Sequence, residues 1–233
     1  MNSKNETQSL STSKRSKVSR KSPASGLLVT YALLLLSAIP IIAGAFRLNE
    51  MASGAEITPE NARFFEIPLP MVLHIISASI FTILGAFQFA SGFRMRWPGW
   101  HRAAGKFLVI CGLVSGITAL WIVLVSSRPP GTGDLLYAFR LIFGSAFVVF
   151  IYLGFTAIRK GDVIRHSAWM IRGYAIGIGT GTNVLTQLVG LLIFGPPNEM
   201  RVALQMLTSW LINLAVAEWV IRKRLAPPAR PNK

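Results

Sequence analysis

Six apolar segments, each long enough to cross a lipid bilayer, constrain the fold of this chain more than any other feature. They cover residues 27–46, 70–93, 103–126, 135–158, 167–194 and 202–221. A helix of about 20 residues spans a hydrocarbon core of about 30 Å, where no water is available for unpaired backbone groups. The segments lack the strict alternation of polar and apolar residues that a membrane β-barrel requires. The sequence therefore predicts an all-α, polytopic bundle of six transmembrane helices.

The composition agrees with a membrane protein. Only 14% of the residues are charged and 52% are hydrophobic, whereas about a quarter of a soluble domain is charged. The single cysteine, Cys111, excludes an internal disulfide framework and argues against a thiolate metal cluster. The net charge of +15 would suggest nucleic acid in a soluble chain. In this chain the charge follows the loops, so we expect a lipid bilayer as the partner and no nucleic acid.

The placement of the basic residues predicts the orientation. With the N-terminus inside, nineteen of the 24 lysines and arginines fall on the inner side. This excess indicates a cytoplasmic (inner) membrane protein with both termini in the cytoplasm and anionic lipid headgroups at that face. Residues 1–25 would form a disordered basic tail, 26–222 the transmembrane domain with its core at 70–195, and 223–233 a second basic tail.

Two loops carry signals of local structure. The inner loop at 94–106 reads RMRWPGWHRAAGK, and we expect Pro98 and Gly99 to make its turn before the third helix begins. In the outer loop, Thr58 followed by Pro59 predicts a short surface helix that starts there, with Thr58 as its N-cap. Phe64 and Phe65 of that helix would lie in the membrane interface.

Two of the three histidines, His101 and His166, lie at the predicted inner ends of the third and fifth helices. Because they share a depth, they could face each other and bind a haem iron or another metal ion, for which imidazole is a suitable ligand. A quinone is another possibility, with histidine and arginine addressing its carbonyl oxygens. Without a cofactor, both histidines would contact headgroup phosphates or cap helix ends.

His74 lies about one turn into the second helix, at a depth where ionisable residues usually have a function. Arg140 lies at the same level in the fourth helix, where it could snorkel outward, pair with Asp134 or Glu66, or hold an anion. Arg172 is its counterpart near the inner end. The candidate cofactor-binding residues are His101, His166, His74, Arg140 and Arg172, with His101 and His166 as the haem or metal ligands.

Other polar residues and glycines at membrane depth favour helix packing. Glu218 is expected to pair with Arg222, four residues later. Gly173, Gly177 and Gly181 are spaced four residues apart, which predicts close approach of neighbouring helices. The other candidates for hydrogen bonds between helices are Gln88, Asn183, Gln187, Gln205 and Asn213.

The chain resembles the DUF2306 family of predicted membrane proteins. The residues that carry the resemblance are His74, Gln88, Arg94, His101, Arg102, Gly105, Arg140, His166, Trp169, Met170 and Arg172, within about residues 70–195. The resemblance implies a helical membrane fold and no particular reaction. The histidine pattern is also distantly similar to transmembrane cytochromes of the b561 type. Those proteins use two histidine pairs, and this chain has three histidines, so at most one bis-histidine haem is possible.

Three functions are compatible with these observations. The first is membrane redox chemistry or electron transfer with a b-type haem or a quinone. The second is transport of a small solute or proton along His74, Arg140, Asn183 and Gln187, although no clearly broken helices are expected, and these mark many transporters. The third is a non-catalytic role as a membrane sensor or assembly protein.

Overall fold

The chain forms a bundle of helices in the computed structural model, which describes residues 23–59 and 61–225. Nine helices and no strands occur within these residues, which confirms the all-α class. The helices are α1 (Pro23–Ser53), α2 (Ala62–Glu66), α3 (Pro68–Gln88), α4 (Ser91–Arg96), α5 (Pro98–Val125), α6 (Asp134–Arg159), α7 (Val163–Gly177), α8 (Gly179–Phe194) and α9 (Glu199–Leu225). The predicted tails at 1–25 and 223–233 lie mostly outside the described residues.

Five of these helices, α1, α3, α5, α6 and α9, are long and apolar enough to cross a membrane. Helices α7 and α8 pass the same test only as a pair, and they are bent by 44° where they meet. Counted as one span, the pair gives the six predicted spans within the described chain. The prediction of an unbroken fifth helix was wrong.

The bend between α7 and α8 has a local cause. Gly177 and Gly179 flank Ile178, and glycine is a poor helix former. The backbone N–H of Gly181 donates to the carbonyl of Ile178, only three residues earlier, at 3.0 Å, which tightens the turn. Asn213 of α9 donates its side-chain N–H to the carbonyl of Ala175 at 3.1 Å. A break at membrane depth is tolerated because neighbouring helices satisfy the freed backbone groups in this way.

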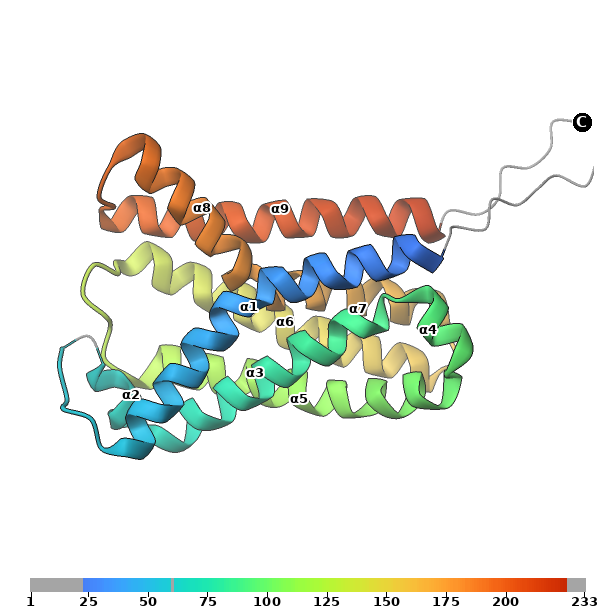
Figure 1. The fold of residues 1–233 in the computed structure, drawn as a ribbon, viewed down its shortest axis with the longest axis horizontal. Helices are drawn as coiled ribbons and strands as arrows, with labels where there is room; N and C mark the ends of the chain where they lie inside the picture. Colours follow the sequence, from blue (N-terminus) through green and yellow to red (C-terminus); the bar gives the residue numbers. More distant parts are fainter. Residues whose placement is uncertain (1–22, 60, 226–233) are drawn as a thin grey trace, which may run out of the picture.

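The helices pack in a simple order. Helix α3 lies along α5, α5 along α6, and α6 along α7, while α1 contacts α3 and α8, and α9 contacts α6, α7 and α8. Figure 1 shows α2 and the longer loops at one end of the bundle, here called the α2 end. At the other, the α4 end, lie α4, the start of α1 and the end of α9. The charge asymmetry predicts that the α2 end faces outward.

Glycines let the helices approach closely, as their spacing predicted. A Cβ on Gly173 would lie 2.8 Å from the Cδ1 atom of Ile151 in α6. A Cβ on Gly181 would overlap the backbone carbonyl oxygen of Leu36 in α1. Real side chains do not approach a backbone atom so closely, so α1 and α8 can pack in this way only without a side chain at position 181.

The inner loop differs from its prediction. Helix α3 ends at Gln88, α4 forms a separate short helix, and α5 already begins at Pro98. Proline has no backbone N–H to satisfy in a first turn, so it starts a helix more readily than it forms the preceding turn. The backbone N–H of His101 donates to the carbonyl of Trp97 at 3.1 Å, which places His101 inside the first turn of α5.

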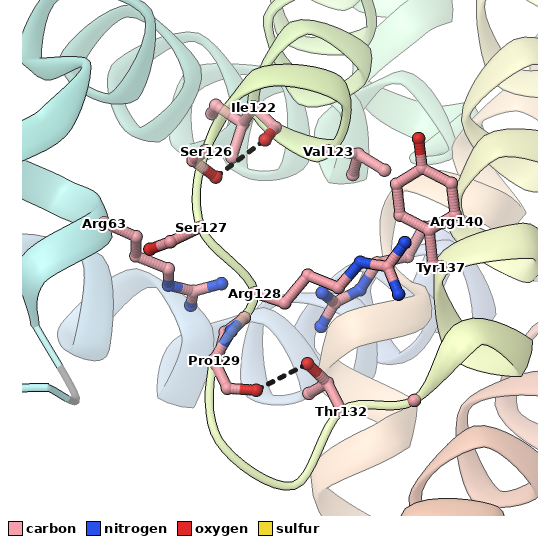
Figure 2. A pocket seen from close by; sticks show the side chains of 11 residues that line it. Arg63, Ile122, Val123, Ser126, Ser127, Arg128, Pro129, Thr132, Tyr137 and Arg140 are labelled. Atoms are coloured by element: carbon pink, nitrogen blue, oxygen red, sulfur yellow. Dashed lines mark hydrogen bonds between the residues drawn. The ribbon is translucent and has the colours of Figure 1, made fainter.

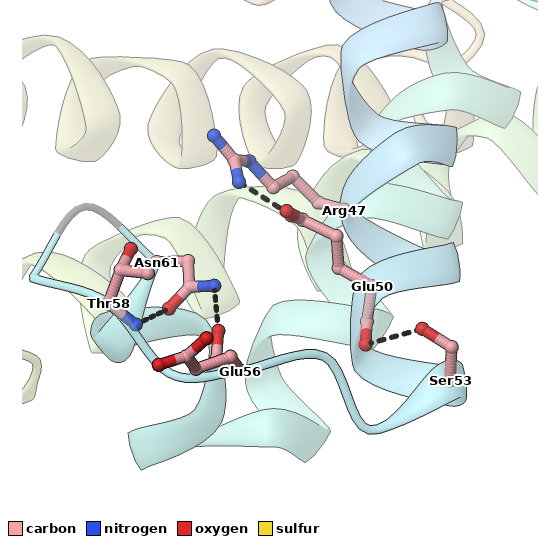
Figure 3. Close-up of polar contacts among 6 residues, drawn as sticks. All are labelled: Arg47, Glu50, Ser53, Glu56, Thr58 and Asn61. Atoms are coloured by element: carbon pink, nitrogen blue, oxygen red, sulfur yellow. Dashed lines mark hydrogen bonds and ion pairs between the residues drawn. The ribbon is translucent and has the colours of Figure 1, made fainter.

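The surface helix at the other end also starts later than predicted. It begins at Ala62 instead of following Thr58. Asn61 shapes the preceding loop: its Oδ1 accepts from the N–H of Thr58 at 2.7 Å, and its Nδ2 donates to the carbonyl of Glu56 at 2.9 Å (Figure 3). The loop is therefore closed by an asparagine side chain. Phe64 is buried, at 8% exposure, so its ring packs against the protein.

Candidate ligand site

A partly open cavity of about 370 Å³ lies between the helices of the bundle. Residues of α1, α2, α3, α5, α6 and α9, together with the bend between α7 and α8, line it. Ligand pockets in proteins commonly measure about 300–1,000 Å³ and are mostly apolar, with a few polar groups that orient the ligand. The size and the lining of this cavity fit that description.

The polar end of the cavity is formed by three side chains at the α2 end. Arg63 comes from α2, His74 from the second turn of α3, and Arg140 from the second turn of α6. The structure therefore brings together His74 and Arg140, which the sequence placed at one level. It adds Arg63, one of the five basic residues that the predicted orientation leaves on the outer side. Its place in a short helix directly before the second span was the available signal.

A smaller pocket adjoins the cavity and shares Arg63 and Arg140 with it. Figure 2 shows Arg63 and Arg140 directed into this space from opposite sides, with Arg128 between them. Arg128 is paired with Asp134 and lies over the ring of Tyr137 at 4.4 Å. Its charge is therefore already compensated within the chain.

His74 is held in one orientation by its backbone contact. Its Nδ1 lies 3.0 Å from the carbonyl oxygen of Ser115 in α5. A carbonyl can only accept a hydrogen bond, so Nδ1 carries the proton. In the neutral ring the lone pair on Nε2 then remains available to a ligand in the cavity.

Arg63 and Arg140 lack acidic partners among the described residues. Arg140 forms no ion pair there, and the Nε atom of Arg63 is buried without a hydrogen-bond partner. Two of the acids at this end are engaged by other arginines: Asp134 by Arg128, and Glu50 by Arg47 at 2.5 Å (Figure 3). The alternative in which Arg140 pairs with Asp134 or Glu66 is not observed.

Glu66 is engaged by the loop that precedes α6. Its carboxylate accepts a hydrogen bond from the backbone N–H of Ser127 at 2.8 Å. Hydrogen bonds from Ser127 hold the pKa of Glu66 below its ordinary value. The carboxylate is thus charged at neutral pH and already bound to another group.

Burial of the charge at Arg63 has a measurable consequence. Desolvation, followed by the charges of Arg140 and Arg47, lowers the pKa of Arg63 to about 10. Both effects disfavour the charged form. Arg63 is nevertheless a cation at neutral pH, so the α2 end carries two partly buried positive charges that repel each other.

The deeper end of the cavity is apolar. Phe81 and Phe147 meet edge to face, with ring centroids 5.4 Å apart. Trp210 of α9 also lines the cavity and stacks on Phe143, with ring centroids 4.4 Å apart. The cavity therefore joins a cationic head region to an aromatic interior.

His101 and His166 lie at the α4 end and do not line this cavity. The Nδ1 of His166 donates to the carbonyl of Gly154 at 2.8 Å, which leaves its Nε2 free. The Nδ1 of His101 is buried without a hydrogen-bond partner among the described residues, and the charge of His166 reaches His101. Both histidines thus lie at the α4 end, on α5 and α7, and these two helices have no Cα atoms within 8 Å of each other.

A metal site of ordinary composition is not present in the described part of the chain. Within it, no group of three or more histidine, cysteine, aspartate or glutamate residues lies close enough to hold an ion. His101 and His166 would need further ligands, either from a porphyrin or from water, to complete a coordination shell.

Arg172 is engaged in an ion pair at the α4 end. Its Nε and Nη2 donate to the two carboxylate oxygens of Glu218 in α9, at 2.5 and 3.0 Å. Glu218 forms its ion pair with Arg172 and not, as predicted, with Arg222, because α7 and α9 pack together and bring the half-buried guanidinium of Arg172 within reach. This ion pair joins α7 to α9, and Arg172 does not line the cavity.

The remaining polar candidates hold helices together or lie elsewhere. Asn213 accepts from the hydroxyl of Thr182 at 2.9 Å, which ties α9 to α8. Gln205 of α9 donates to the carbonyl of Thr186 in α8 at 3.3 Å. Asn183 and Gln187, expected on a transport path, do not line the cavity.

The fold defines a polytopic α-helical membrane protein with a cavity between its helices. A family model described as a predicted membrane protein (DUF2306) matches residues 71–221, so the chain belongs to that family. The match extends beyond the region of resemblance seen in the sequence and includes most of α9. No curated protein and no solved structure matches the chain. The likeness to b561-type cytochromes rests on the histidine pattern alone.

Proposed function

We propose that this protein binds a small amphipathic molecule in its central cavity. The polar head would lie between Arg63, His74 and Arg140, and the apolar part among Phe81, Phe147 and the other aromatic residues. The observation that supports this is one continuous cavity with cationic groups at one end and aromatic rings at the other. The ligand would enter near the α2 end, from the outer side if the charge asymmetry holds.

Redox chemistry is the more specific form of this proposal, and a quinone is the redox-active class that suits the cavity. The oxygens of a quinone would accept hydrogen bonds from the guanidinium of Arg140. A hydroquinone hydroxyl would donate to the free Nε2 of His74, because Nδ1 already carries the proton. His74 is therefore placed to receive a proton from a bound hydroquinone.

A b-type haem would occupy a separate site at the α4 end. His101 and His166 would be its ligands, and the haem would supply one-electron transfer. In favour of this are the unpartnered Nδ1 of His101 and the backbone contact of His166, since a ligating histidine usually donates its other ring N–H in this way. A reduced-minus-oxidised absorption spectrum with metal analysis tests the haem form, and a protein without a Soret band or bound iron excludes it.

Transport of the ligand is the second candidate function, and the bend between α7 and α8 favours it. Many transporters carry broken helices beside a central substrate site. Thr180 and Gly181, in the first turn of α8, line the cavity here. Uptake of the amphiphile into the lumen of proteoliposomes is compared with the amount that the same protein binds in nanodiscs. Uptake beyond that amount separates transport from binding.

The proposed binding is tested by filling the cavity. Ala119 of α5 lines it, and Ala119→Phe should obstruct it. Ala103→Phe adds the same ring at an exposed position of the same helix and is the matched control. We expect Ala119→Phe to abolish binding of a decyl-benzoquinone and of dodecanoate to the protein in nanodiscs, as measured by tryptophan fluorescence. If neither probe binds the native protein above empty nanodiscs, the proposal fails.

A further inference from the structure

We infer that the polar head of the bound molecule is an anion, a carboxylate or a phosphate, held between Arg63 and Arg140. This inference rests on the proposed function and gives the chemical class of its ligand. The molecule would be an anionic amphiphile whose chain extends toward Phe81 and Trp210. A neutral quinone, the ligand of the redox form of the proposal, would fit the cavity but bind less tightly than an anionic amphiphile, as would an alcohol.

The first argument is the lack of neutralisation at the α2 end. Arg63 and Arg140 are partly desolvated, and neither has an ion pair within the described chain. A buried charge is costly unless it is paired, and this cost rises when two like charges share one space. The Nε of Arg63 is a buried donor without an acceptor. An anion would compensate both charges and accept a hydrogen bond from this Nε–H group.

The second argument is the geometry of the two guanidinium groups. Arg63 comes from the surface helix α2 and Arg140 from α6, and they enter the pocket from opposite sides, with the Arg128 side chain, already paired with Asp134, between them in this view (Figure 2). Guanidinium presents a planar set of donors that matches a carboxylate or a phosphate. An anion bound between them would bridge α2 to the bundle.

The third argument is the contrast with the neighbouring arginines. Arg128 has Asp134, Arg47 has Glu50, and Glu66 is bound to Ser127. Arg128 and Arg47, near the pocket, are thus each paired with an acid of the chain. Arg63 and Arg140, which line both the cavity and the smaller pocket, have no such partner within the described residues. This distribution is what a site for an external anion requires.

The fourth argument identifies the ligand as an amphiphile. Beyond Arg63 and Arg140 the cavity continues between Phe147, Ile178 and Met206, all of which are apolar. A free phosphate ion would leave this volume without a partner. An alkyl chain attached to the anion would fill it and would gain from the burial of apolar surface.

The inference is tested with three probes that share one chain and differ in the head. The full-length protein in zwitterionic nanodiscs is titrated with dodecanoate, dodecyl phosphate and dodecanol, and with inorganic phosphate as a head without a chain. Binding is followed by tryptophan fluorescence, since Trp210 lines the cavity, and Trp210→Phe identifies its signal. We expect the two anionic amphiphiles to bind roughly tenfold or more tightly than dodecanol.

Substitutions assign the effect to the two arginines. Arg63→Gln and Arg140→Gln should each weaken dodecanoate about tenfold or more and leave dodecanol unchanged. Arg159→Gln makes the same change at an exposed position of α6 and should leave every probe unchanged. Both pocket variants should unfold at a temperature equal to or above that of the native protein without ligand, because each removes an uncompensated charge. A lower unfolding temperature would indicate a structural role instead.

Each outcome bears on a separate statement. Equal binding of dodecanol and dodecanoate overturns the anion, while the proposed binding of an amphiphile stands. Inorganic phosphate binding as tightly as dodecyl phosphate overturns the amphiphile and leaves a site for a free anion. No binding of any probe, with no response to Ala119→Phe, overturns the proposed function itself.

Discussion

Arginines at the two ends of the bundle differ in whether an acidic side chain of the protein pairs with them. At the α4 end, Arg172 of α7 meets Glu218 of α9 through two charged hydrogen bonds. At the α2 end, Arg63 and Arg140 point into one pocket and find no acid within the described chain. A structural arginine is neutralised by its own chain. An arginine without an acidic partner in the described chain can instead bind an anionic ligand.

The bend between α7 and α8 separates these two ends, and disturbing it should have the largest effect. Gly181→Ala places a Cβ against the carbonyl of Leu36, a backbone atom that cannot rotate away. We expect a loss of about 3 kcal/mol in the free energy of unfolding, at the upper end of ordinary overpacking. Reversible unfolding in mixed micelles measures it.

Gly105→Ala is the control for this substitution. Position 105 is helical in α5, and nothing lies within 4 Å of an added Cβ. A helical glycine replaced by alanine without a clash should gain about 0.5–1 kcal/mol. If Gly181→Ala is as stable as Gly105→Ala, then α1 and α8 are not packed as described.

Breaking the ion pair at the α4 end should have the next largest effect. Glu218→Gln leaves Arg172 without its carboxylate and should cost about 1–2 kcal/mol, a range lowered from that of a fully buried pair because both side chains keep some contact with solvent. Glu199→Gln, at an exposed position of the same helix, is the matched control. A Glu218→Gln protein as stable as its control would show that the α4 end does not depend on neutralisation.

Much of the fold was predictable because it depends on hydrophobicity alone. Six segments had to be helices in a bilayer, and their number survives even where one of them bends. The bend was missed because Gly173, Gly177 and Gly181 were interpreted as a packing motif. Whether glycines pack or break a helix depends on the neighbours, here Asn213 on α9, which accommodates the freed carbonyl of Ala175.

The site was predictable in part. Depth along a helix placed His74 and Arg140 at one level, since rise per residue is fixed. Arg63 could not be placed, because the path of a 14-residue loop between α1 and α3 depends on contacts such as those of Asn61. Partner choice was also beyond the sequence: Glu218 had Arg222 within one turn and yet pairs with Arg172 from another helix.

Removing a charge at the α2 end should act in the opposite direction from removing one at the α4 end. Arg140→Gln eliminates a desolvated cation and its repulsion with Arg63, so the ligand-free protein should gain about 1 kcal/mol. Adding dodecanoate should reverse the order, because the native protein gains from binding and the variant does not. Thermal unfolding with and without dodecanoate measures both signs. A variant that is less stable than the native protein in both conditions would mean that Arg140 has an internal partner.

The smallest expected effect is the dependence of the unligated α2 end on pH. Burial lowers the pKa of Arg63 to about 10, and the charges of Arg140 and Arg47 act in the same direction, while His74 is neutral at alkaline pH. A cation whose folded pKa is depressed costs stability at every pH below that value, and the cost is relieved as pH rises through about 10. The difference in unfolding temperature between the native protein and Arg63→Gln should therefore shift in favour of the native protein between about pH 8 and pH 11. Other groups that titrate in this range are common to both proteins and cancel in the difference. With saturating dodecanoate the difference should instead stay flat over this range, because the bound anion favours the charged form of Arg63 and keeps it protonated. A difference that stays flat with pH in both conditions would show that Arg63 is hydrated like a surface arginine, and the contrast between the two ends would then rest on Arg140 alone.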